Sequence, residues 1–320
     1  MDYLKLTTIE RPGKKLILLI CAIASLFTSC SHQDQKAESR IATGSLIALP
    51  NTYITTSESS RRQDWFNNHK LPIISSLTSD EAGVPTNKKL DFKSLKVAVD
   101  FFEKLIINQA GKDTITGVRV YFASMPLGSA KSGRLTLIFG ATAGKDTADV
   151  QNYYGFKNGE LDSNKLDTAT VRPWVHNYQL NIRPKLLTTM DVKDPCKETK
   201  HVWFSLAQIK SIIIEMKYQM GRHPEIVKGF GVRFTSYTDQ DYSFLSLKPV
   251  PHHKRITIGF TFIDWEGEDI GIKQIDATEF LERLKITKMQ KGLGGDTFDT
   301  GDPTPPPSTG NKAELDVSDE

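Results

Sequence analysis

A pattern of one helix followed by two strands occurs twice along the chain, and it limits the possible folds more than any other feature. Apolar residues recur at helical spacing from Leu95 and again from Leu206, each time after a serine that can cap a helix. Two strand-like runs of alternating apolar and polar residues follow each helix. The pattern predicts an α+β fold made of two copies of a helix–strand–strand unit.

The matching motifs occur in the same order in both copies. Ser94 and Ser205 are 111 residues apart, whereas the motifs Gly117-Val118-Arg119 and Gly231-Val232-Arg233 are 114 residues apart. The second strand-like runs, from Arg134 to Phe139 and from Arg255 to Phe260, are 121 apart. The added residues would lie in the connections, where loops accept insertions.

At the helices, this alignment pairs Leu95 with Leu206 and Phe102 with Ile213, and it predicts that all four are buried. Two unrelated helix-and-hairpin segments remain the alternative, because matches as short as Gly-Val-Arg are common in proteins.

The alternation predicts which strand residues face the core. Val118 and Val120 lie on one face of their strand, so Arg119 and Tyr121 lie on the other, and Arg233 has the equivalent place in the second copy. Two guanidinium groups in equivalent places would suit an anionic partner, such as a carboxylate, a phosphate or an acidic glycan. The alternative is that each arginine forms a structural salt bridge.

Composition divides the chain into six expected parts. These are a signal peptide (1–29), a tether (30–62), the first unit (63–140), an inserted segment that packs on the body (141–202), the second unit (203–291) and a disordered acidic tail (292–320).

Hydrophobic residues make up 38% of the chain and charged residues 25%, so the chain can bury a core and is not a disordered protein. The net charge of +3 is the sum of two regions of opposite sign. Seven acidic residues and one lysine follow Gly295, so the tail carries −6 and the body is basic. A basic body favours anionic lipid, anionic glycan or an envelope protein as its partner; nucleic acid is not expected.

The first 30 residues have the features of an export signal. Arg11, Lys14 and Lys15 precede an unbroken stretch of twelve apolar or small residues, Leu16 to Phe27. A helix needs about 20 such residues to span a bilayer, so the stretch fits the hydrophobic region of a secretory signal peptide.

The sequence Thr28-Ser29-Cys30 that follows resembles the lipobox of bacterial lipoproteins, although Phe27 stands where the family usually has leucine. The resemblance implies cleavage before Cys30 and lipid attachment to that cysteine. The mature protein would then be anchored to a membrane of the cell envelope, with the outer membrane favoured, and it could face either the periplasm or the cell surface. The resemblance does not extend to the folded body.

Cysteine usage agrees with this interpretation. Cys21 lies within the hydrophobic stretch, so the mature chain would keep only Cys30 and Cys196. If Cys30 carries lipid, an intrachain disulfide cannot form; a Cys30–Cys196 bridge in an unprocessed chain is the alternative.

Two short motifs begin like ligand sites but lack required residues. The segment Gly140 to Asp146 has three residues between its glycines where a phosphate loop has four, and Asp146 replaces the magnesium-binding Ser or Thr. The segment from Asp239 begins like a calcium loop, but Phe244 and Val250 replace the required glycine and glutamate. We therefore expect no metal and no cofactor.

The histidines give no catalytic motif. His252 and His253 are adjacent in a basic connection, and neighbouring residues of an extended chain point to opposite sides. The favoured hypothesis is a lipid-anchored binding or assembly module without catalysis. The alternative is an envelope hydrolase whose active site is assembled from distant residues around His176, His201 or His252.

Overall fold

A computed structural model describes residues 56–78, 90–92, 94–107, 115–126, 132–144, 148–157, 160–162, 164–189, 198–239, 254–270, 283 and 302–304. These residues belong to one compact unit, Leu46–Glu320. The expected signal peptide, Cys30, Cys196, and the pair His252 and His253 lie outside the described residues.

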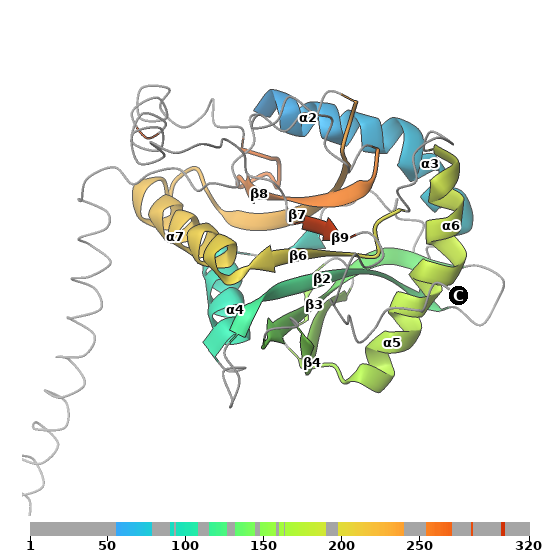
Figure 1. Cartoon of the computed structure of the whole chain (residues 1–320). Helices are drawn as coiled ribbons and strands as arrows, with labels where there is room; N and C mark the ends of the chain where they lie inside the picture. The colour runs from blue at the N-terminus through green and yellow to red at the C-terminus, as the bar shows by residue number, and fades with distance from the viewer. Residues whose placement is uncertain are drawn as a thin grey trace, which may run out of the picture. The chain divides into compact units, whose positions relative to one another are not determined.

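The described part is an α+β protein (Figure 1). Its helical segments are α2 (Thr56–Trp65), η1 (Phe66–Lys70), α3 (Leu71–Leu77), α4 (Leu95–Ile107), α5 (Thr168–Asn177), η2 (Tyr178–Ile182), α6 (Arg183–Leu186), η3 (Leu187–Thr189) and α7 (Leu206–Arg222). Its strands are β1 (Leu90–Asp91), β2 (Ile115–Pro126), β3 (Ser132–Ala143), β4 (Ala148–Lys157), β5 (Glu160–Leu161), β6 (His201–Ser205), β7 (Gly229–Ser236), β8 (Ile256–Ile263) and β9 (Asp302–Thr304).

A helix followed in sequence by two strands of a hairpin occurs twice, as α4–β2–β3 and as α7–β7–β8. Each helix has the cap expected from its serine. Ser205 and Gln208 form a reciprocal capping box at α7, with hydrogen bonds of 3.2 and 2.7 Å, and the Ser94 hydroxyl accepts from the amide of Val97 at 3.2 Å. Each hairpin is antiparallel, as the alternation predicts.

The strands follow the order β8-β7-β1-β5-β4-β3-β2-β6-β9, and the pair β1–β5 is parallel while the other pairs are antiparallel. The strand before each helix pairs with the hairpin of the other unit. Asp91 of β1 lies opposite Gly231 of β7, and Ser205 of β6 lies opposite Gly117 of β2. A Cβ atom on Gly117 would lie 2.2 Å from the Phe204 carbonyl oxygen, so this close approach requires glycine.

The reciprocal pairing corrects the predicted alignment of the helices. Asp91 and Ser205 are 114 residues apart, the same separation as the two glycines that they face. At this separation Leu95 corresponds to Ile209 and Phe102 to Met216, and all four are buried. Leu206, predicted to match Leu95, is only partly buried. The duplication itself stays a hypothesis.

The pairing within each hairpin also corrects which residues of β3 and β8 correspond. Arg119 lies opposite Gly140, and Arg233 lies opposite Gly259, so the equivalent residues are 119 apart. The predicted correspondence of Arg134 with Arg255, at 121, is therefore wrong by two residues. A shift of two keeps every side chain on its face of the strand, which is why the pattern did not reveal it.

The main core lies on one face of the sheet, where α4 and α7 pack against each other. Its aromatic members include Phe122 of β2 and Phe234 of β7, whose ring centroids are 6.1 Å apart, so distant strands meet across this face. A smaller core on the opposite face joins α5 to β2, β3 and β4; its buried members are Tyr121, Ala123, Ile138, Tyr153, Val171 and Val175. Both faces of β2 are thus covered (Figure 1).

A buried polar network connects the N-terminal helical segments to the sheet. Lys70 of η1 donates to Glu198, and neither side chain is exposed. Glu198 also accepts from the amides of Thr199, at 2.9 Å, and Ile256, at 2.7 Å. Beside it, burial and then the charge of Glu198 raise the pKa of Tyr178 well above its ordinary value. The carboxylate thereby links η1 and β8 to the segment that precedes β6.

Both terminal expectations change in detail. The tether was expected to reach residue 62, but α2 begins at Thr56. The tail was expected to be unstructured, but Asp302, Pro303 and Thr304 form β9 and pair with β6. Proline lacks an amide hydrogen and is accepted on edge strands, which is the position of β9 in the sheet order.

Candidate functional site

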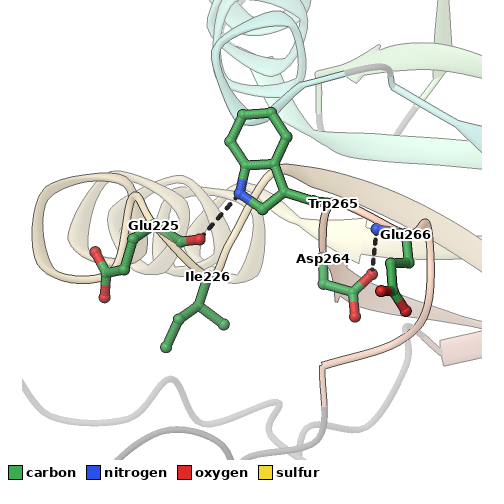
Figure 2. Close-up of a pocket in the computed structure, with 5 residues that line it drawn as sticks. All are labelled: Glu225, Ile226, Asp264, Trp265 and Glu266. Atoms are coloured by element: carbon green, nitrogen blue, oxygen red, sulfur yellow. Dashed lines mark hydrogen bonds between the residues drawn. The ribbon is translucent and has the colours of Figure 1, made fainter.

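A surface depression with a volume of about 370 Å³ lies where the turn after β8 meets the segment after α7 (Figure 2). Its lining residues are Glu225, Ile226, Asp264, Trp265 and Glu266. Trp265 is 63% exposed, the largest fraction among the large apolar side chains that the structure describes. An exposed indole is a candidate contact for a partner.

Local hydrogen bonds close the turn that carries Trp265. The Asp264 carboxylate accepts from the amides of Glu266 and Glu268, both at 2.9 Å, and the Asp264 amide donates to the Glu268 carbonyl at 3.0 Å. Gly267 has φ 83°, a conformation that side chains with a Cβ rarely adopt. The sequence Asp-Trp-Glu-Gly thus specifies a tight turn with the indole at its tip.

The other wall of the depression is set by the end of α7. His223 is the C-cap residue, and its carbonyl accepts from the amides of Ile226, at 3.1 Å, and Val227, at 2.9 Å. This bend brings the Glu225 carbonyl to the indole Nε1 of Trp265, which donates to it at 2.9 Å. The hydrogen bond holds the indole upright between the two segments (Figure 2).

The depression is acidic, although the body as a whole is basic. Three of its five lining residues, Glu225, Asp264 and Glu266, are acidic. The ammonium group of Lys228 lies 5.8 Å from the centroid of the Trp265 ring, within the range of a cation–π interaction. An exposed indole in acidic surroundings is suited to hold a cationic group.

The sequence-predicted ligand residues of the first unit lie in a buried cluster. Arg119 forms an ion pair with Asp149, whose carboxylate also accepts from the hydroxyl of Tyr121 and, at 3.2 Å, from that of Tyr153. The side chains of Arg119 and Asp149 are 1% and 0% exposed, and both tyrosines are fully buried. This geometry is that of a structural ion pair, the alternative left open by the sequence.

Arg233, the equivalent residue of the second unit, also pairs with an aspartate. Its Nε lies 2.5 Å from a carboxylate oxygen of Asp269, and the two side chains are 30% and 34% exposed. The structure thus places both arginines in ion pairs and on separate strands. Ligand binding by Arg119, Tyr121 and Arg233 stays a prediction.

The candidate histidines of the hydrolase hypothesis are in different places. His201 is buried in β6, and its ring lies edge-on to Tyr121 with a centroid distance of 5.4 Å. His176 is on α5. Over the described ranges, no group of three His, Cys, Asp or Glu side chains is placed to hold a metal ion, and no helix is long and apolar enough to cross a membrane.

Comparison with protein-family models, with curated proteins and with solved structures gives no match for the chain. The depression is therefore judged on its own chemistry. Sequence reasoning did not select Trp265, although a tryptophan in a short polar run that ends in glycine is a usable signal. Its partner segment at Glu225 is 40 residues away in sequence and could not be paired with it by spacing.

Proposed function

We propose that the chain is a lipid-anchored binding module of a bacterial cell envelope, and that the depression at Trp265 binds a cationic group of its partner. The observation that carries the binding site is the exposed indole, held by the Glu225 carbonyl in a depression with three acidic lining residues. A lysine, arginine or quaternary ammonium group over the indole would gain cation–π attraction, and the carboxylates would add charge complementarity.

The anchor and the location rest on the signal-like first 30 residues. Cleavage before Cys30 and lipidation of that cysteine would place the body on the membrane without a spanning helix. The tether would then let the body reach a partner in the envelope. The partner in this proposal is an envelope protein that presents a basic segment.

Binding is tested with the mature chain carrying Cys30→Ser, which keeps the protein soluble. Fluorescence anisotropy with labelled hexalysine should show saturable binding that weakens about two- to fivefold in Trp265→Ala, the magnitude expected for loss of one exposed cation–π contact. Ile214→Ala is the matched control, because Ile214 is 55% exposed on α7 and lies outside the depression. Equal affinities for hexalysine in the two variants would contradict the assigned site.

Lipidation is tested separately by mass spectrometry of the mature N-terminus. We expect an N-terminal, acylated Cys30, and we expect Cys30→Ala to be released from the membrane fraction. Retention of Met1, or full membrane binding of the variant, would remove the anchor from the proposal and leave the binding site to stand alone.

A further inference from the structure

Arg255 is a completely buried arginine immediately before β8. It has no exposed surface, and none of the residues that the structure describes accepts a hydrogen bond from its Nε, Nη1 or Nη2 atoms. The other buried arginines near the sheet differ in this respect. Arg119 and Arg283, for example, are paired with Asp149 and Glu215.

A buried guanidinium group needs an anion for two reasons. Removal of a charge from water is costly unless the charge is paired and hydrogen-bonded. Lysine or histidine can avoid the cost by losing a proton, but arginine stays charged at every pH at which proteins fold. Arg255 therefore has five N–H donors and a positive charge to satisfy inside the protein.

A second donor without an acceptor is close to Arg255 on the same face of the hairpin. Tyr237 donates its amide to the Arg255 carbonyl at 3.0 Å, which extends the β7–β8 ladder, and Thr235 is two residues before Tyr237. Thr235 and Arg255 thus occupy diagonal positions on one face, within reach of a long side chain. The Thr235 hydroxyl is buried and also has no hydrogen-bond partner in the described part of the chain.

We propose that the β7–β8 hairpin binds a small oxyanion between Arg255 and Thr235. The guanidinium group supplies the charge and paired N–H donors, and the hydroxyl supplies a further hydrogen bond. This donor set fits a carboxylate or a phosphate, since both accept paired hydrogen bonds from arginine. The proposed anion lies on β7–β8 and is independent of the cationic ligand assigned to the Trp265 depression.

The test is the melting temperature of the mature protein in increasing sodium phosphate or sodium acetate, with sodium chloride at matched ionic strength as the reference. We expect a saturable rise of about 3–5 °C at ten times the dissociation constant of the preferred anion. The phosphate and acetate arms distinguish a phosphate site from a carboxylate site. In Arg255→Met the saturable rise should vanish, because the variant removes the buried charge.

A linear response that is equal in wild type and Arg255→Met is a general salt effect and overturns the proposal. No anion response in wild type, together with a lower melting temperature of Arg255→Met, also overturns it, because Arg255 would then be paired by the chain itself. If Arg255→Met does not fold, calorimetry of phosphate or acetate binding to Thr235→Val replaces it. Affinity reduced about fivefold supports the site, and unchanged affinity contradicts it.

Discussion

The strands β2 and β7 both contain the sequence Gly-Val-Arg, but the two arginines have different surroundings. Arg119 and Arg233 each lie opposite a glycine of the hairpin partner, and each pairs with an aspartate. Arg119 is 1% exposed on the face that α5 covers, whereas the Arg233 side chain is 30% exposed. The covering element, and not the local motif, thus decides whether such an arginine is a structural or a surface group.

The largest expected difference in stability is between the variants that remove one or the other of the two aspartates. Asp149→Ala would leave Arg119 buried without that carboxylate, and it should lower the free energy of unfolding by about 3–5 kcal/mol. Asp269→Ala breaks a partly exposed pair and should cost about 0–1 kcal/mol. Denaturant unfolding of both variants measures the difference. Equal costs would mean that the two ion pairs have the same role.

A double replacement sharpens this result. Arg119→Met with Asp149→Leu removes both charges and keeps an apolar side chain at each place, so it should be much less destabilising than Asp149→Ala. Loss of stability equal to that of Asp149→Ala would show that the hydrogen bonds of the cluster, and not the buried charge, carry its stability.

The helix alignment gives the next largest effect. Met216 is fully buried and corresponds to Phe102 in the alignment inferred from the strand pairing, so Met216→Ala should cost about 2–5 kcal/mol. Leu206→Ala should cost less than half as much, because Leu206 is only partly buried. Thermal or denaturant unfolding distinguishes them. A larger cost at Leu206 would favour the alignment first predicted from the serines.

A smaller effect is expected from the tail. Deletion of residues 292–320 removes β9, whose three residues pair with β6, and leaves the rest of the sheet order in place. The truncated protein loses only a few backbone hydrogen bonds, each of which contributes little net stability. Its melting temperature should therefore fall by a few degrees at most. A fall of more than about ten degrees would mean that the tail is part of the folded core.

The smallest effect concerns Asp167, the N-cap of α5, the helix that covers Arg119. Hydrogen bonds from the side chain and then the amide of Thr170 lower the pKa of Asp167. Its contribution to stability is therefore present at neutral pH and is lost as the pH falls through the lowered value. Melts of wild type and Asp167→Asn should differ more at pH 6 than at pH 2. A difference independent of pH would contradict a role for the charge.

The sequence was sufficient for the helix–hairpin units but not for their alignment. Capping and alternation act over a few residues, so Ser205 with Gln208 and the two antiparallel hairpins could be predicted. A shift of three along a helix keeps a similar apolar stripe, so the correspondence of Leu95 with Ile209, and not with Leu206, needed the strand pairing.

Partners that are distant in sequence could not be predicted by spacing. Lys70 and Glu198 are 128 residues apart, and their pairing depends on the packing of η1 against the segment before β6. The candidate site likewise depends on residues that are distant in sequence, because Trp265 and Glu225 lie in two connections that the fold brings together. For Arg119, the sequence could state a salt bridge as an alternative, but only the placement of β4 identified Asp149 as the partner.

The most direct test of the proposed function is a residue-specific titration of the indole groups. The chain has four tryptophans, so a two-dimensional ¹H–¹⁵N spectrum should contain four indole signals. The signal lost in Trp265→Phe identifies Trp265. Hexalysine should shift that signal saturably, with the affinity measured by anisotropy, and leave the other three in place. An unmoved Trp265 signal at saturation, or shifts confined to other tryptophans, would contradict the proposed cation site.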